Sequence, residues 1–435
     1  MSSRIIQIVI ACLAIAVIGV GIFVMTAGDT SQSAERTPVG TAAETPPPWD
    51  GGDIARGSEP PAVPRSVPPR TTTQPRTAAP PPEPVIIAPA PVIVAEPVII
   101  EATDERDYAT VLVNFATNRV MDADADIPDR FTGLVGDLVY GDALVAIPRD
   151  HEAGVLESQN WLMSFIVAPN PESHVLVETL DVRPTAEILA QINAQASTGN
   201  GAVLVYVHGY NTSFDKAARR MGQMTYDLGW DGAAFFYSWP SRAQAGLYFT
   251  DDTAADQSIR VMKQVLGDLG SLPDSPDIIL IAHSMGTRVL SEALQQLVTE
   301  GTPVTNRIST LILAAPDIDK QVFVNDIAPR LDAMEQAAIT LYASSEDSAL
   351  KASRAARGFT RMGDSSDGLI LVDGIEIVDA TGAESDFFGH TYFGDNATII
   401  DDIFDVVHNR LPADERPMLV PRDHPDGTYW AIAVP

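Results

Sequence analysis

The chain has 435 residues, more than one compact domain usually needs, so part of it should lie outside any core. Its 58 acidic residues against 28 basic ones give a formal net charge of −30, which repels phosphate backbones and argues against nucleic-acid binding. The single cysteine, Cys12, excludes an intramolecular disulfide and leaves no thiolate for catalysis or metal binding in the rest of the chain.

The first element along the chain is an uncharged apolar run, residues 5–27. As a helix it would be about 34 Å long, enough for the roughly 30 Å hydrocarbon core of a bilayer. We expect residues 1–28 to be a retained signal anchor, because the run is long and no convincing cleavage site follows it. A cleaved signal peptide and a lipoprotein modified at Cys12 are the alternatives. Arg4 precedes the run, which predicts a single-pass protein of a bacterial inner membrane with its bulk facing the periplasm or exterior.

Residues 29–106 are predicted to be a disordered proline-rich linker, since residues 38–97 hold 17 of the 33 prolines. Near its end, prolines alternate with apolar triplets such as Val85–Ile87 and Val98–Ile100. We interpret these triplets as part of an apolar spacer. The alternative is that they dock on the folded domain or on a partner.

Residues 107–412 have the composition of a globular domain, and residues 413–435 are interpreted as an irregular tail. Short β-rich runs are followed by apolar strands that alternate with helices. This alternation predicts an α/β fold with a mostly parallel sheet, helices on both faces, and antiparallel edge strands from the opening runs. The predicted strands are Val111–Phe115, Ala143–Ile147, Trp161–Val167, Ala202–Val207, Gly232–Ser238, Ile278–Ala282, Ile308–Ala314, Ile339–Tyr342 and Ile375–Val378, and the predicted helices include Thr185–Ser197, Asp215–Leu228, Thr253–Gly270 and Gly286–Thr299.

The strand Ile278–Ala282 runs into His283-Ser284-Met285-Gly286 and then into a helix-forming sequence. This strand–turn–helix context is that of a nucleophile elbow, in which a serine sits on a tight turn. Ala282 replaces the first glycine of the G-x-S-x-G pattern, and its small size meets the same need for close packing. Ser284 is therefore the predicted nucleophile, with a simple structural turn as the alternative.

A second strand end, His208-Gly209-Tyr210-Asn211, stands where an oxyanion loop is needed. The backbone amides of Tyr210 and Met285 are the predicted oxyanion donors. His208 and Trp239 are candidates for the substrate pocket. The alternatives are a histidine that braces the turn and a buried packing tryptophan.

The general base should be a histidine that follows the last strand, in the chain order serine, acid, histidine. His390 lies on such a loop, whereas His408 falls in a predicted helix and His424 in the tail. Asp347 follows the preceding strand and is the favoured orienting acid. Asp317, one strand earlier, is the alternative.

Further short motifs are Phe115-Ala116-Thr117-Asn118-Arg119, Tyr140-Gly141, Ile147-Pro148 with His151, Ser238-Trp239-Pro240-Ser241 and Gly389-His390-Thr391-Tyr392. Together with the His208–Asn211 loop and the Ala282–Gly286 elbow, they resemble a bacterial α/β-hydrolase family known only as domain of unknown function 900. The likeness covers roughly residues 110–411 and implies an α/β-hydrolase fold with a triad at Ser284, Asp347 and His390. Thr391 stands where the family often has serine, and the family has no agreed substrate.

The predicted function is a membrane-anchored serine hydrolase that cleaves a small-molecule or lipid carboxylic ester through a covalent acyl-enzyme. Acyl transfer to an acceptor other than water is one alternative, and an inactive hydrolase fold that acts as an envelope scaffold is another. No cofactor is expected, since the histidines lack metal-ligand spacing and the glycines form no phosphate loop. The basic residues from Lys351 to Arg361 are interpreted as a solvated helix face, with phosphate or carboxylate binding or guidance of a lid as the alternatives.

Overall fold

The computed structural model describes residues 98–103, 106–158, 168–244, 247–382 and 397–433. The apolar run 5–27, most of the proline-rich linker, the strand predicted at Trp161–Val167, and His390 lie outside the described residues. Among the helices that are described, none combines the length and the hydropathy needed to cross a membrane.

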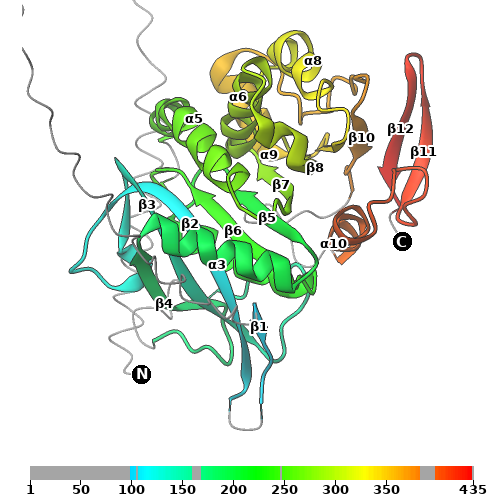
Figure 1. The fold of residues 1–435 in the computed structure, drawn as a ribbon. Coiled ribbons are helices and arrows are strands. Elements are labelled where there is room, and N and C mark those ends of the chain that lie inside the picture. The colour runs from blue at the N-terminus through cyan, green and yellow to red at the C-terminus, as the bar shows by residue number, and fades with distance from the viewer. Residues whose placement is uncertain (1–97, 104–105, 159–167, 245–246, 383–396, 434–435) are drawn as a thin grey trace, which may run out of the picture. The chain divides into compact units, whose positions relative to one another are not determined.

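One mixed sheet organises the described chain (Figure 1), in the order β11-β12-β10-β9-β8-β7-β5-β6-β2-β3-β4, with β1 paired to β2. The strands from β2 through β6, β5, β7, β8, β9 and β10 to β12 are parallel to their neighbours, whereas β1, β3, β4 and β11 pair in the antiparallel sense. Their bounds are β1 Ile99–Ile100, β2 Tyr108–Met121, β3 Phe131–Pro148, β4 Leu176–Arg183, β5 Ala202–Val207, β6 Ala233–Ser238, β7 Asp277–His283, β8 Ile308–Ala314, β9 Ala338–Ala343, β10 Glu376–Asp379, β11 Leu419–His424 and β12 Gly427–Ile432.

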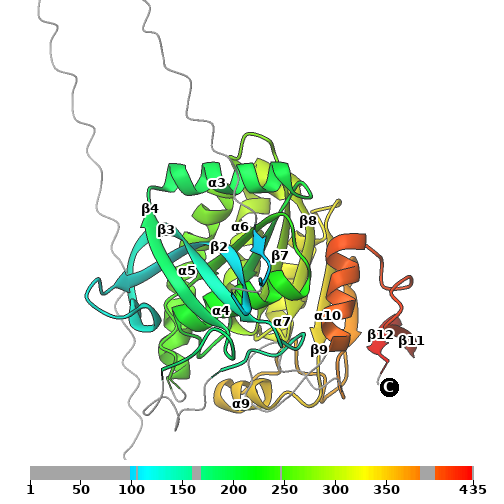
Figure 2. The ribbon, with the colours of Figure 1, turned by 90° about the horizontal axis from the view of Figure 1, so that it is seen from below.

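Helices cover both faces of this sheet, and Figure 2 shows α3 and α4 on opposite sides of the strands. The apolar faces of α3, α5 and α6 pack into one core, and those of α4 and α10 pack into a second. The helices are α3 Thr185–Thr198, α4 Phe214–Asp227, α5 Tyr248–Gly270, α6 Met285–Thr299, α7 Lys320–Val322, α8 Ala328–Leu331, α9 Ser348–Arg357 and α10 Ala397–Phe404. One π-helical segment, Phe323–Ile327, joins α7 to α8, and another, Asp405–Asn409, extends α10.

The central strands are continuous apolar runs because each strand contributes side chains to both cores. In β5, Val203, Val205 and Val207 face one core, whereas Leu204 and Tyr206 face the other. Successive side chains of a strand point to opposite faces, so a strand covered on both sides must be apolar at every position. The parallel sheet with helices on both faces, and its antiparallel opening, are therefore confirmed.

The chain order reverses at β5, and this reversal positions the site. From β5 the chain moves outward to β6 and then crosses back to form β7 on the other side of β5. In open α/β sheets, such a switch point leaves a crevice at the carboxyl ends of the two strands. The segments that follow β5 and β7 are the His208–Asn211 loop and the turn at Ser284.

The last residues are not irregular, which corrects the interpretation of residues 413–435 as an irregular tail. Strands β11 and β12 form a hairpin, and β12 lies parallel to β10 at the sheet edge. The hairpin is preceded by Arg416, whose fully buried side chain pairs with Asp402 and Glu376. Ion pairing of this kind inside the protein ties the segment to the rest of the domain.

The apolar triplet Val98–Ile100 also differs from its interpretation as a spacer. Ile99 and Ile100 pair with Val111 and Thr110 of β2, and Val98 is 5% exposed. Of the alternatives for the triplets, docking on the folded domain therefore holds for this one.

Candidate active site

Ser284 occupies a strained turn between β7 and α6. Its backbone φ of 51° and ψ of −124° put a non-glycine residue in the left-handed half of φ space, which costs roughly 1–3 kcal/mol. The Ser284 amide donates to the Ala314 carbonyl at 2.9 Å, and its carbonyl accepts from the Thr287 hydroxyl at 2.6 Å and the Asp317 amide at 3.3 Å. These bonds to β8, α6 and the loop after β8 hold the strained turn in place.

Two glycines let the turn at Ser284 approach the His208–Asn211 loop, which is the predicted oxyanion loop. A Cβ on Gly209 would lie 2.8 Å from the Ser284 Cβ, and one on Gly286 would lie 2.2 Å from the His208 carbonyl oxygen. Separations this short are never met by real side chains, so both positions need glycine. The end of β5 therefore packs directly on the turn that carries Ser284.

The predicted oxyanion donors belong to these two abutting segments. Met285 is the first residue of α6, a 15-residue helix, so its amide lies in the first turn, where N–H groups lack helical acceptors and the helix dipole favours negative charge. Tyr210 immediately follows Gly209, which touches Ser284. This arrangement can present two amides to an oxygen on a carbon bonded to Ser284.

The oxyanion loop is braced from behind by Arg119, a buried residue of β2. Its guanidinium donates to the Thr212 carbonyl at 2.8 Å, the Ser241 carbonyl at 2.8 Å and the Ser238 hydroxyl at 2.8 Å. Burial lowers the Arg119 pKa, and the Asp251 carboxylate acts in the opposite direction. The single side chain thus ties the loop after β5 to the loop after β6.

His208 is a second part of this bracing. Its Nδ1 bonds to the Gly209 carbonyl at 2.8 Å, and its Nε2 lies 3.2 Å from the Arg119 guanidinium. Because arginine only donates, Nε2 must accept and the ring is neutral. Burial, followed by the charge of Arg119, lowers the His208 pKa to about 3. This imidazole is therefore not placed to take a proton from a nucleophile.

Trp239 packs against that histidine. The two rings stack at 5.1 Å, and the indole nitrogen of Trp239 donates to the His208 carbonyl at 2.7 Å. Both side chains are fully buried, and neither is among the described residues that line the pocket at Ser284. His208 and Trp239 were expected to line the substrate pocket. In the described part of the chain they instead pack against each other and support the loop.

Asp251, at the start of α5, completes the support of the loop. It accepts from the Ser241 hydroxyl at 2.6 Å and the Arg242 amide at 2.7 Å, and lies 3.4 Å from the Asn211 amide. The carboxylate is fully buried, and charge-assisted bonds of this kind are the stronger ones. Asn211, at a φ of 56°, is thereby held in the left-handed region.

Ser284 opens into a pocket of about 270 Å³. The described residues that line it are Tyr210, Tyr248, Ser284, Asp317, Ala349, Leu350, Ala352, Ser353 and Ala356. Five of these nine come from α9, so that helix forms one wall. The size is just below the roughly 300–1,000 Å³ usual for small-molecule sites.

The two candidate acids stand in different surroundings. Asp347 is half-buried and caps α9, where its Oδ1 accepts from the Leu350 amide at 2.9 Å. Asp317 is 2% exposed and accepts from the hydroxyls of Tyr248 and Ser353, each at 2.6 Å. Only Asp317 is among the described residues of the pocket. Of the other histidines considered, His408 bonds to the Leu228 carbonyl at 2.8 Å and His424 ends β11.

A family model described as alpha/beta hydrolase of unknown function (DUF900) matches residues 185–410, just over half of the chain. The chain belongs to this family. The matched region begins with α3 and contains the oxyanion loop, the elbow at Ser284 and both candidate acids. The resemblance is thereby confirmed over residues 185–410, and the fold is that of an α/β hydrolase. The quoted motifs before residue 185 lie outside the match.

Two solved structures are similar to the chain at low identity. One, from a study of two fungal esterases of Rhizomucor miehei, has 11% identity and a TM-score of 0.29, and covers 68% of this chain and 82% of its own. The other, the NocB thioesterase domain in covalent complex with a fluorophosphonate nocardicin G analog, has 19% identity and a TM-score of 0.25, and covers 45% of this chain and 91% of its own. Neither likeness carries a conclusion on activity. No curated protein matches the sequence.

The basic stretch of this DUF900 chain is not simply a solvated face, which corrects the interpretation of residues 351–361. Arg361 is 2% exposed and lies 3.4 Å from an Asp317 oxygen, and Arg357 pairs with Asp252 of α5. Arg354 binds Asp367 on the outer side, and Lys351 is exposed. Three of the four basic side chains are therefore paired with carboxylates of the same chain.

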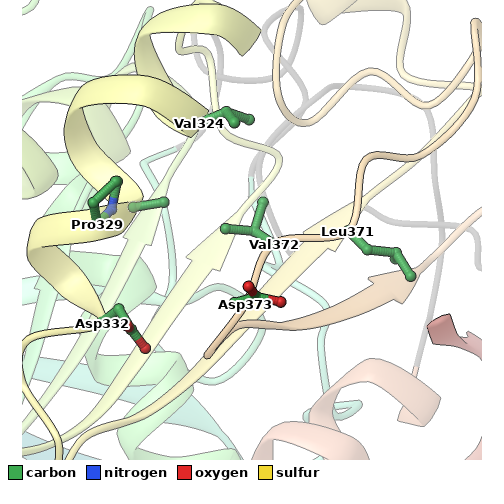
Figure 3. A pocket seen from close by; sticks show the side chains of 7 residues that line it. Val324, Pro329, Asp332, Leu371, Val372 and Asp373 are labelled. Atoms are coloured by element: carbon green, nitrogen blue, oxygen red, sulfur yellow. The ribbon is translucent and has the colours of Figure 1, made fainter. Parts of the chain in front are cut away.

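A second cavity, of about 350 Å³, lies elsewhere in the domain (Figure 3). It is built from residues that precede β9 and β10, among them Pro329, Asp332 and Asp373, whereas Ser284 follows the end of β7. Asp332 also faces Gly374, where a Cβ would lie 2.2 Å from its carboxylate oxygen. Among the described residues, no group of three or more His, Cys, Asp or Glu is arranged to hold a metal ion.

Sequence reasoning on this DUF900 chain missed four residues of the site: Arg119, Tyr248, Asp251 and Ser353. Arg119 lies within one of the quoted motifs, but nothing in the motif indicated a contact 93 residues away. Tyr248 and Ser353 lie 105 residues apart and meet only through the fold. For Ser353, the spacing of small residues along α9 was the one available signal.

Proposed function

We propose that the protein is a serine hydrolase that cleaves a carboxylic ester through a covalent acyl-enzyme on Ser284. The observation that carries this proposal is the position of Ser284. It sits on a strained turn at the switch point of the sheet, touches the oxyanion loop and opens into a small pocket. Strain of this kind clusters at active sites, where the surrounding structure holds it in place.

In the proposed reaction, the Ser284 hydroxyl attacks the ester carbonyl while His390 takes its proton and then delivers it to the leaving alcohol. The amides of Tyr210 and Met285 stabilise the oxyanion. Asp347 orients the imidazole, and water then releases the acid from Ser284. Asp347 is preferred to Asp317 because the Asp317 oxygens already bind two hydroxyls and lie beside Arg361.

The test is turnover of short-chain 4-nitrophenyl esters by wild type and Ser284→Ala. Ser284→Ala should lower kcat about a thousandfold or more, as nucleophile removal does in other serine hydrolases. Ser291→Ala is the matched control, because Ser291 is also buried, lies on the helix that follows Ser284 and does not line the pocket. Activity that survives in Ser284→Ala would contradict the proposal, and transfer to an added alcohol in preference to water would favour an acyltransferase.

We also propose that residues 5–27 tether the domain to a membrane, because the run is long, apolar and uncharged. Arg4 before the run favours a domain outside the cytoplasm. Extraction of cell membranes with alkaline carbonate measures this. The full chain should stay in the pellet, and release into the supernatant would contradict the tether.

A further inference from the structure

One face of α9 shapes the pocket at Ser284. Ala349, Ala352, Ser353 and Ala356 follow the spacing i, i+3, i+4 and i+7, which puts them on a single helix face. Three of the four carry only a methyl group. The pocket exists because this face is small, and Ser353 is its one polar member.

Ser353 belongs to a compact polar cluster at the pocket wall. Its hydroxyl donates to Asp317 Oδ1 at 2.6 Å, and the Tyr248 hydroxyl donates to Asp317 Oδ2 at 2.6 Å. The two hydroxyl oxygens lie 2.8 Å apart. All three residues line the pocket together with Ser284.

The number of hydroxyl protons in this cluster determines which ligand groups it can bind. A serine and a tyrosine hydroxyl have one proton each, and each proton is donated within the cluster, either to Asp317 or to the other hydroxyl. What the cluster still offers to the pocket is oxygen lone pairs. A bound group must therefore be a hydrogen-bond donor, and a group that only accepts, such as a ketone or an ether, gains nothing there.

The charge of the cluster is already balanced. The Arg361 guanidinium lies 3.4 Å from Asp317 Oδ1, and Arg357 donates to the Tyr248 oxygen at 3.0 Å while it pairs with Asp252. Another cation would meet two guanidinium groups near the carboxylate, which repel it. A neutral donor suits the site better than an ammonium group.

We propose that this pocket selects esters that carry a hydroxyl group on the part that enters it, bound by Ser353, Tyr248 and Asp317. The inference rests on the proposed ester hydrolysis and names its substrate class. The hydroxyl belongs either to the acyl half or to the alcohol half of the ester, and both halves share the same recognition chemistry. The alanine face of α9 contacts the carbon chain of that part.

The experiment compares isosteric ester pairs in which a hydroxyl replaces a methyl group. For the acyl half, the pairs are the 4-nitrophenyl esters of 3-hydroxybutyrate and 3-methylbutyrate, and of 6-hydroxyhexanoate and heptanoate. For the alcohol half, the pair is 2-hydroxyethyl butyrate and propyl butyrate. The readout is the kcat/KM ratio of each pair, divided by the ratio of their rates of alkaline hydrolysis.

In at least one pair, wild type should prefer the hydroxylated ester about tenfold or more, the value of one hydrogen bond in a partly charged cluster. Ser353→Ala and Tyr248→Phe should each bring that ratio towards one, and Ser353→Thr, which keeps the oxygen, should retain it. Ser366→Ala is the control, because this exposed hydroxyl contacts Arg354 of the same helix but does not line the pocket. Thermal unfolding checks that each variant is folded.

Ratios near or below one in every pair would overturn the inference while leaving ester hydrolysis in place. A preference that survives in both Ser353→Ala and Tyr248→Phe would also overturn it. If no ester is turned over, the proposed function and this inference fail together.

Discussion

At the scale of single residues, the two candidate acids differ in their contacts, and the proposed reaction gives them separate roles. Asp317 is enclosed by Tyr248, Ser353 and Arg361, so its oxygens are largely engaged. Asp347 uses one oxygen to cap α9. In the proposed reaction Asp347 also orients the imidazole, whereas Asp317 stays on the pocket wall.

These separate roles predict that two isosteric substitutions change different kinetic quantities. Asp347→Asn should lower kcat by about 10⁴ with little change in KM, because the imidazole loses the partner that fixes its tautomer. Asp317→Asn should act mainly on the preference between paired esters. Steady-state kinetics on both variants measures this, and a larger loss of kcat in Asp317→Asn would reverse the assignment.

Arg119 gives a second prediction at this scale. Arg119→Lys keeps the charge but cannot reach the three oxygens of the loops after β5 and β6. A displaced oxyanion loop should lower kcat by about a hundredfold. Arg149→Lys, at an exposed position, is the control, and an Arg119→Lys variant that unfolds at a lower temperature but keeps full kcat would show that the contact is only structural.

At the scale of elements, the site depends on the contact between the start of α6 and the end of β5. Gly286→Ala should destabilise the domain by about 1–3 kcal/mol and lower kcat, because its Cβ would meet the His208 carbonyl at 2.2 Å. Gly267→Ala in α5 is the matched control. It has no neighbour within 4 Å and should stabilise the helix by about 0.5–1 kcal/mol. Denaturant unfolding compares the two, and equal stabilities would contradict the close packing.

The elements that the sequence predicted best are those with the strongest pattern. The predicted strands at 202–207 and 308–314 coincide with β5 and β8, because continuous apolar runs mark strands buried on both faces. β4 was missed because three charged residues interrupt its apolar pattern at the sheet edge. The hairpin β11–β12 was missed because Pro421 and two charged residues, Arg422 and Asp423, hide its alternation.

At the scale of the whole molecule, His151 joins distant parts of the domain. The buried imidazole lies 2.8 Å from Glu157 and 2.7 Å from Asp227 of α4. Burial alone would lower the His151 pKa, but the hydrogen bonds to Asp227 and Glu157 outweigh it and raise the pKa to about 9. The charged imidazole therefore stabilises the fold.

Because the folded pKa exceeds the unfolded value of 6.5, the folded state binds the extra proton between these two values. The stabilisation is complete below pH 6.5 and is lost as the pH rises through about 9. It amounts to about 3 kcal/mol at most. Denaturant unfolding from pH 6 to 10 should show this decline in wild type and a flatter profile in His151→Gln. His174→Gln is the control, and an unchanged slope in His151→Gln would contradict the coupling.

Some residues of the site can be predicted from local sequence patterns, whereas others come together only in the fold. Ser284 and the loop at Gly209 follow local sequence patterns, because an elbow and an oxyanion turn each need a few consecutive residues. The cluster of Tyr248, Asp317 and Ser353 spans 105 residues, and no local pattern encodes such a contact.

Covalent labelling with a fluorophosphonate tests the central claim most directly, because the reagent reacts with a serine that is activated and accessible. The wild-type protein should take up one label, and mass spectrometry of its peptides should locate that label on Ser284. The Ser284→Ala variant, folded to the same thermal stability, should take up none. A folded wild type that stays unlabelled, or a label that persists in Ser284→Ala, would contradict the account.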